Sequence, residues 1–422
     1  MAILIKNIKK LVQTEKEPVK WVAGKDMAHV QTLDNAYLFM DEGKIITFGP
    51  MSHLSDDEVF WEGKDCQVID AEGKMVFPSF VDSHTQLVYP LSREIEYIDK
   101  IKGLSYEEIA KRGGGILNSA KALKEMSEEE LLKGSLKRLD EVIKYGTGAV
   151  EIKSGYGLSF DGELKMLRVI KKLKSMSPLT IRSTFLGAHA VPLEYRNNRE
   201  KYVDMVINEM LPQVALEGLA DYIDVFCDKG FFTVEDTERI LAAGAEYGLR
   251  GKIHANELDF SGGVQAGVKY NALSVDHLEY VGEDEINALL GSETMPTVLP
   301  GAAFFLGMVY APARKMIDAG LPLAMASDFN PGSSPSGNMQ FILSMASIAY
   351  KLLPQEGINA TTINTAYALE LSDVLGSIAV GKKANVFITK EIPTVEYMPY
   401  YYGTNKVDTV ILNGKVIYEG LD

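Results

Sequence analysis

Eight short apolar runs, separated by stretches of helical character, fill the middle of the chain and constrain its fold most strongly. Strand-like runs that alternate with amphipathic helices are typical of repeated βα units around a parallel sheet. Their number matches a (β/α)8 barrel of the TIM type, which is the α/β fold class that we predict. The runs lie at residues 76–82, 147–153, 180–189, 221–228, 251–257, 272–277, 295–300 and 321–328.

An open, doubly wound sheet would also alternate strands and helices. It would carry a glycine-rich phosphate turn directly after an early strand. Gly113-Gly114-Gly115 follows a helical stretch instead and lacks that context, so we interpret it as a flexible loop over the site. Residues 127–145 are typical of the intervening helices, because three glutamates occupy the first turn, as the helix dipole favours.

Both ends of the chain have the pattern of short strands joined by turns. Residues 36–49 predict one hairpin around Glu42-Gly43, and residues 407–418 predict another around Asn413-Gly414, a pair that suits a type I′ turn. We expect one small β-sandwich built from both termini. The alternative is two separate β-domains, each short of core. The predicted boundaries are 1–75, 76–378 and 379–422 for the N-terminal part, the barrel and the C-terminal part.

The composition argues against several classes of partner. The chain has 422 residues and a net charge of −15, which disfavours nucleic acid and anionic membranes. The most apolar window, residues 301–309, is too short to span a bilayer. With only Cys66 and Cys227, and no charged-then-apolar leader, we expect a cytoplasmic protein in a reducing compartment.

Histidines at the ends of apolar runs suggest a metal-centred site. His84, His189, His254, His277 and Asp328 each close a run, so in a barrel all five would point into one mouth. A lone His at a strand end usually satisfies a backbone carbonyl, but four of the six histidines at such positions favour ligation. Imidazoles with one carboxylate suit one Zn²⁺ or Fe²⁺ ion with an open position for water.

An acidic residue follows one of these histidines closely. Glu257 lies three residues after His254 and could orient the water or relay its proton. The alternative interpretation is an acid at the start of the next helix. His29 and His53 lie in the terminal β segments, where we expect structural or solvated roles.

Several phrases resemble the amidohydrolase superfamily and, within it, the imidazolonepropionase family. They cover nearly the whole barrel and reach the C-terminal β segment, and the Ser-Gly-Tyr-Gly and Asn-Pro-Gly-Ser phrases are the most specific. The phrases are Asp82-Ser-His84-Thr, Ser92-Arg93-Glu94, Leu104-Ser-Tyr106-Glu-Glu-Ile, Gly113-Gly-Gly-Ile, Glu151-Ile-Lys-Ser-Gly-Tyr156-Gly-Leu, Thr184-Phe-Leu-Gly-Ala-His189, Asp224-Val-Phe-Cys, His254-Ala-Asn-Glu257, Asp276-His277-Leu, Leu299-Pro-Gly, Ser327-Asp328-Phe-Asn330-Pro-Gly332-Ser333 and Gly376-Ser-Ile-Ala-Val-Gly-Lys-Lys-Ala.

The resemblance implies an enzyme of histidine degradation that hydrolyses the ring of 4-imidazolone-5-propionate to N-formimidoyl-L-glutamate. It implies that the metal ligands are His84, His254 and Asp328, and that Glu257, His277 and Asp328 are catalytic. A propionate tail suits Arg93, whose planar fork matches a carboxylate. A homodimer is also implied. The residues implied to bind substrate are Arg93, Tyr106, Tyr156, His189, Glu257, Asn330, Gly332 and Ser333.

One position departs from the family pattern. The family usually has His-x-His where this chain has His84-Thr85-Gln86, and residues two apart in a strand face the same way. Gln86 is therefore a possible ligand, and its neutral oxygen predicts weaker metal binding than imidazole gives. Three accounts stay open: a working enzyme of this family, an amidohydrolase acting on another small cyclic amide, and a metal-poor homologue that only binds a ligand.

Overall fold

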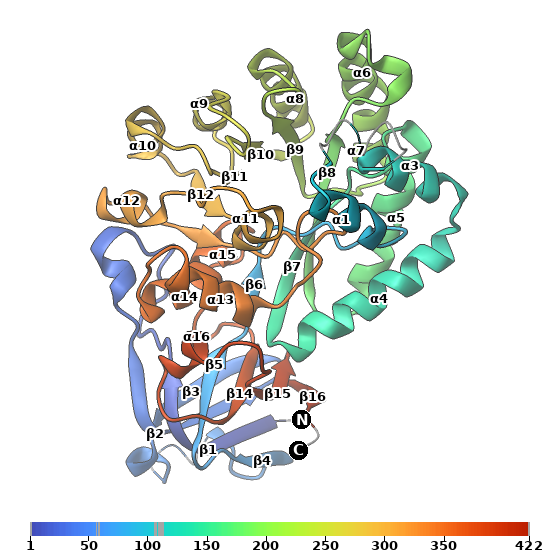
Figure 1. The fold of residues 1–422 in the computed structure, drawn as a ribbon. Coiled ribbons are helices and arrows are strands. Elements are labelled where there is room, and N and C mark those ends of the chain that lie inside the picture. The colour runs from blue at the N-terminus through green and yellow to red at the C-terminus, as the bar shows by residue number, and fades with distance from the viewer. Residues whose placement is uncertain (1, 56, 58–59, 105–107, 109–113, 421–422) are drawn as a thin grey trace.

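The chain forms a parallel barrel beside a separate mixed sheet (Figure 1). The computed structural model describes residues 2–55, 57, 60–104, 108 and 114–420. Within them, no helix is both long and apolar enough to cross a membrane. The (β/α)8 class that the alternating runs predict is confirmed.

The barrel sheet contains eight strands in an uninterrupted sequential order. All its recorded strand pairs are parallel. Its ends meet through a bridge between Thr85 and Phe329, and the Asp328 amide donates to the His84 carbonyl at 3.0 Å. The strands are β6 (Phe80–Asp82), β7 (Thr147–Lys153), β8 (Thr180–Ala188), β9 (Tyr222–Cys227), β10 (Arg250–Ala255), β11 (Ser274–His277), β12 (Met295–Val298) and β13 (Ala324–Met325).

Helices surround the barrel, and most of them bury apolar residues against it (Figure 1). The predicted helix at 127–145 is α4, where Ser127 and Glu130 form a capping box that satisfies the first backbone amides. The helices are α1 (Glu94–Ile101), α3 (Ile116–Glu125), α4 (Glu128–Lys144), α5 (Phe160–Met176), α6 (Arg199–Met205), α7 (Leu211–Leu216), α8 (Val234–Glu246), α9 (Gly263–Lys269), α10 (Glu283–Leu289), α11 (Pro300–Leu306), α12 (Ala313–Asp318), α13 (Met339–Ile348), α14 (Pro354–Thr361), α15 (Ile363–Tyr367) and α16 (Tyr397–Tyr400).

The second sheet combines strands from both ends of the chain, as predicted. Its eight strands form one hydrogen-bonded sheet. The two expected hairpins are present, and positive φ angles at Glu42-Gly43 and at Asn413-Gly414 fit tight turns between antiparallel strands. The strands are β1 (Ala2–Val12), β2 (Thr32–Asp41), β3 (Lys44–Pro50), β4 (Cys66–Asp70), β5 (Lys74–Pro78), β14 (Val386–Glu391), β15 (Val407–Leu412) and β16 (Lys415–Glu419).

The predicted boundary between residues 75 and 76 falls inside β5, so the barrel begins later than the apolar run suggested. β5 pairs with β14 through Pro78, whereas β6 pairs with β7 from Phe80. The chain passes from the terminal sheet to the barrel at Ser79. The Ser79 amide donates to the Asn385 carbonyl, beside the terminal sheet, and the Phe80 amide donates to the Gly146 carbonyl in the barrel. Both strands are buried and apolar, so the sequence shows one run where the structure has two. The other predicted boundary, 378/379, lies between α15 and β14.

Candidate metal centre and active site

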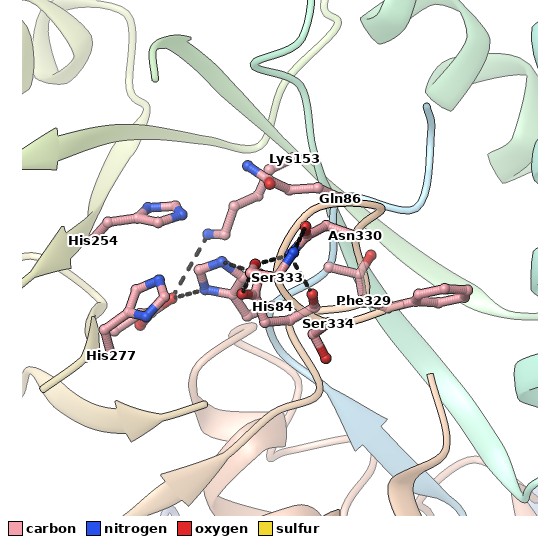
Figure 2. A network of polar contacts seen from close by, with 12 residues as sticks. His84, Gln86, Lys153, His254, His277, Phe329, Asn330, Ser333 and Ser334 are labelled. Carbon is pink, nitrogen blue, oxygen red and sulfur yellow. Dashed lines mark hydrogen bonds and ion pairs between the residues drawn. The ribbon is translucent and has the colours of Figure 1, made fainter. Parts of the chain in front are cut away.

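Three histidines meet at the carboxyl end of the barrel (Figure 2). His84 follows β6, His254 lies in β10, and His277 is the last residue of β11. One ring nitrogen from each lies within 4.8 Å of the others, and all three side chains are buried. The structure therefore brings these sequence-predicted residues together, because parallel strands end on the same face of a barrel.

The backbone at this mouth adopts conformations that non-glycine residues rarely accept. The φ angle is 54° at Asp328, 86° at His277 and 67° at Leu278. Such angles persist where surrounding contacts fix the chain, and they concentrate at functional sites. At Asp328 the conformation places Oδ1 at 3.4 Å from Nε2 of His84.

A carboxylate lies behind each of two imidazoles. Asp276 Oδ2 is 2.6 Å from Nδ1 of His84, and Asp224 Oδ1 is 3.0 Å from Nδ1 of His254. Burial strongly lowers the pKa of His84. Burial also acts to lower the pKa of His254, but the adjacent Asp224 carboxylate outweighs it and the pKa is raised. Contacts at Nδ1 leave Nε2 of both rings for another ligand.

Two acids share the buried space in front of these rings. Burial and the nearby Asp328 raise the pKa of Glu257 to about 8, and burial raises the pKa of Asp328 to about 6. Glu257 Oε2 lies 3.5 Å from Nε2 of His277, whose own pKa is strongly lowered by burial. Carboxyl groups that resist ionisation in this way are stabilised as anions when a cation lies between them.

The donor set fits a divalent cation. Nε2 of His84 is buried and has no hydrogen-bond partner among the residues that the structure describes. It faces Asp328 and the rings of His254 and His277, so nitrogen and carboxylate ligands surround one space. That combination suits Zn²⁺ or Fe²⁺.

Comparison with known sequences identifies the family. The sequence profile of the Amidohydrolase family matches residues 75–417. "Imidazolonepropionase" of Christiangramia forsetii is 54% identical over 417 residues, covering 99% of this chain and 100% of that protein. "Imidazolonepropionase" of Geobacillus thermodenitrificans is 40% identical, covering 98% of this chain and 97% of that protein. The chain belongs to the imidazolonepropionase family.

Solved structures of more distant proteins share the fold of this family member. A 5-methylcytosine deaminase from Klebsiella pneumoniae, liganded with phosphonocytosine, superposes with a TM-score of 0.73 at 18% identity, covering 99% of this chain and 98% of that one. An adenosine deaminase from Xanthomonas campestris with bound zinc has a TM-score of 0.69 at 16% identity, covering 98% of this chain and 92% of that one. At these identities the likeness establishes the fold alone.

Arg93 lies at the start of α1, beside the loop that follows β13. Its guanidinium carbon is 5.9 Å from the centre of the Tyr156 ring, and its Nη1 is 3.8 Å from Glu96. Any Cβ on residue 332 would overlap the guanidinium, so Gly332 is the residue that admits Arg93 here. Nε of Arg93 is buried and unpartnered among the described residues, which leaves a donor for an anion.

The loop after Asp328 is held by its own side chains. Asn330 Oδ1 accepts from the amides of Gly332 and Ser333 at 2.8 and 2.9 Å. Ser333 Oγ in turn donates to Asp328 Oδ2 at 3.1 Å. Asn330, Gly332 and Ser333 therefore fix both the Asp328 carboxylate and the space beside Arg93.

Two aromatic rings connect Arg93 to the histidine cluster. The Tyr156 ring lies 5.5 Å from that of His189, which lies 6.0 Å from that of His254. Nδ1 of His189 is 2.9 Å from the Gly155 carbonyl, and burial lowers the pKa of His189 to about 3. His189 is thus a neutral ring that donates from Nδ1 and presents its other nitrogen as an acceptor.

Gln86 is buried beside this path. Tyr156 Oη donates to its Oε1 at 2.9 Å, while its Nε2 has no partner among the described residues. That hydrogen bond occupies one lone pair of the oxygen that a metal would use. Metal ligation by Gln86 stays a prediction. Tyr106 and Gly113, also named from the sequence, lie outside the described residues.

The sequence prediction missed a set of charged residues beneath and beside the histidines. The sequence does contain a sign of these residues, because each of them is a charged residue within or next to an otherwise apolar strand. Glu279, two residues after His277, has a buried carboxyl 3.8 Å from Nδ1 of that ring. The others are Glu151, Lys153, Asp224, Lys252 and Asp276, all fully buried inside the barrel.

Proposed function

We propose that this chain hydrolyses the cyclic amide of 4-imidazolone-5-propionate to N-formimidoyl-L-glutamate, a step of histidine degradation. One observation carries the proposal for the site: a buried histidine and carboxylate centre is joined through Tyr156 and His189 to a buried arginine. The reacting amide and the propionate of one small substrate match these two ends. The curated relatives are named imidazolonepropionase and match this chain over nearly its whole length, which supports the same reaction.

One divalent ion, Zn²⁺ or Fe²⁺, is the cofactor in this proposal. His84, His254 and Asp328 would hold it, with Gln86 as a possible further ligand. Lewis-acid activation of water and of an amide carbonyl is the chemistry that such an ion supplies. The adenosine deaminase of the same fold was solved with bound zinc, which supports a divalent metal as the cofactor.

Proton transfer falls to Glu257 and His277. Glu257 accepts a proton from the attacking water, whose oxygen bonds to the carbonyl carbon. His277, 3.5 Å from Glu257, polarises the carbonyl or carries the proton onward. The ring carbon–nitrogen bond then breaks and the nitrogen takes up that proton, so one water and one cyclic amide give a formimidoyl group and a carboxylic acid. The acid releases the second proton of the water to solvent and becomes a carboxylate.

The remaining residues orient the substrate. Arg93 binds the propionate through its planar donor fork. Tyr156, His189, Asn330, Gly332 and Ser333 line the path between Arg93 and the metal ligands, and Tyr106 is the further substrate-binding residue that we propose. Holding both ends of a small molecule places the amide at the reacting groups and reduces the entropy lost in the transition state.

The decisive experiment follows the ultraviolet absorbance of the imidazolone after addition of purified protein. The assay is run as purified, after chelation, and after Zn²⁺ or Fe²⁺ is restored. We expect turnover that chelation abolishes and metal restores. A metal-loaded, folded protein that neither binds nor hydrolyses the compound would refute the proposal and favour another small cyclic amide.

We also propose a cytoplasmic homodimer that acts on a small molecule and on no nucleic acid or membrane. The net charge of −15 supports the absence of polyanionic partners. Sedimentation of the purified protein at micromolar concentration tests the dimer, and a mass of 46.5 kDa would contradict it.

A further inference from the structure

Five charged side chains lie fully buried inside the barrel, beneath the histidines. Glu151 and Lys153 are two apart on β7 and so share its inner face. Asp224 on β9, Lys252 on β10 and Asp276 on β11 complete the set. Buried charges are costly to keep unless they are paired, so their contacts decide what the set does.

The two lysines make different contacts. Lys153 Nζ lies 2.7 Å from Asp224 Oδ2, 2.8 Å from Glu151 Oε1 and 3.7 Å from Asp276 Oδ2. Lys252 Nζ lies 2.7 Å from Glu151 Oε2 and donates to the carbonyls of Ser83 and Ala368. Among the described residues, only Lys153 ion-pairs with both Asp224 and Asp276.

Those two aspartates are the carboxylates behind the imidazoles. Asp276 Oδ2, the atom nearest Lys153, also contacts Nδ1 of His84. Asp224 uses Oδ2 for Lys153 and Oδ1 for Nδ1 of His254. A carboxylate at Nδ1 fixes both the tautomer and the orientation of a ligating histidine. Figure 2 shows Lys153 reaching toward the cluster.

We propose that Lys153 is a positioning residue for the metal centre. Its one ammonium holds the two carboxylates that orient His84 and His254, and so aims Nε2 of both rings at the same ion. Without the ammonium, Asp224 and Asp276 repel each other in a buried space, and the two rings lose their common orientation. This inference rests on the metal centre of the proposed function but not on the substrate.

The test compares Lys153→Met with Lys252→Met. Each change removes one fully buried ammonium and keeps an unbranched side chain. Metal-stripped proteins are titrated with Zn²⁺ against a chromophoric chelator, and with Co²⁺ to record the ligand-field absorption. We expect Lys153→Met to weaken Zn²⁺ binding about 10- to 100-fold and to change the Co²⁺ spectrum. Lys252→Met should lose clearly less Zn²⁺ affinity than Lys153→Met, because both aspartates keep their ion pairs with Lys153 and only the Ser83 carbonyl beside His84 loses a donor.

A double variant separates the loss of the Lys153–Asp224 ion pair from the cost of leaving an unpaired buried charge. Lys153→Met/Asp224→Asn removes one positive and one negative charge, so the net buried charge is unchanged. If Lys153 acts through Asp224, the double variant should lose less affinity than the sum of its two single changes. Unchanged Zn²⁺ affinity and Co²⁺ spectrum in folded Lys153→Met would overturn the proposal. So would equal losses in both lysine variants, which would indicate a general effect of buried charge. Metal binding without imidazolone turnover would refute only the proposed function.

Discussion

At the residue scale, the sequence predicts the proposed metal ligands and catalytic residues at the barrel mouth better than the buried charged residues that orient them. His84, His254, His277 and Asp328 each close an apolar run, and barrel geometry alone places such residues together. Lys153 stands at the end of such a run too, but its role depends on pairing with distant strands. No local pattern shows which acids a buried lysine meets.

Replacing Arg93 tests the carboxylate end of the site. Arg93→Lys keeps the charge but loses the planar fork, so we expect the KM for imidazolone propionate to rise about tenfold or more. The matched comparison is a substrate analogue with its propionate amidated, for which both proteins should perform alike. An unchanged KM for the natural acid would contradict the role of Arg93.

Replacing Gln86 tests the departure from His-x-His. Gln86→His supplies an imidazole nitrogen in place of an amide oxygen, so we expect greater retention of Zn²⁺ during dialysis. Tyr156→Phe is the control, because it removes the hydrogen bond to Gln86 without adding a ligand. Equal or lower retention by Gln86→His would show that residue 86 does not face the ion.

At the element scale, the alternating pattern predicts the number and order of barrel strands, because each strand is a continuous apolar run. It fails at the first strand, where β5 and β6 are both apolar and separated only by Ser79. Which of two sheets a buried strand joins is decided by long-range pairing. The segments after β6 and β13 that close the barrel lack the apolar pattern of a strand. They are joined by Asp82, whose carboxylate accepts hydrogen bonds from the amide and hydroxyl of Ser327.

Asp82 gives this closure a pH dependence. Burial raises its pKa to about 7, so its contribution to stability is full below the ordinary carboxyl range and is lost as pH rises through about 7. Asp82→Asn removes that titration. The unfolding free energy of the metal-free variant, relative to the unmodified protein, should therefore rise between about pH 4 and 7, by at most about 1.4 kcal/mol per pH unit.

Urea unfolding at several pH values measures this difference. Asp70→Asn is the control, since the hydrogen bond from Asn7 lowers the pKa of that exposed carboxyl below its ordinary value, so the relative stability of this variant should stay constant between about pH 4 and 7. A relative stability of Asp82→Asn that does not vary with pH would rule out the titration.

At the scale of the whole molecule, the hairpins at both ends predicted a shared terminal domain, because neither end alone has enough apolar residues for a core. Their assembly into one sheet could not be predicted, since β5 pairs with β1 on one side and, across the whole barrel sequence, with β14 on the other. The apolar cluster of that sheet includes Ile5 of β1, Val76 of β5 and Ile388 of β14, so both ends of the chain contribute to it.

Metal removal should affect the stability of the entire protein. An ion that binds only the folded state adds about 2.7 kcal/mol at a concentration 100 times its Kd. We expect the chelated protein to unfold a few degrees lower in a thermal scan and to recover when Zn²⁺ or Fe²⁺ is added. Asp328→Ala, which lacks a proposed ligand, should show no such recovery. If the Tm of the unmodified protein changes neither on chelation nor on addition of metal, the proposed metal centre is contradicted.

The position of β5 between β1 and β14 also sets the order in which the molecule can be made. Phe77 of β5 pairs with Phe387 of β14. The partner strand of β5 is therefore synthesised only after nearly the whole chain has been made. Contacts of such high sequence separation form slowly, and an unpaired edge can join another chain meanwhile. During translation, the N-terminal strands therefore present an open edge until the last strands leave the ribosome.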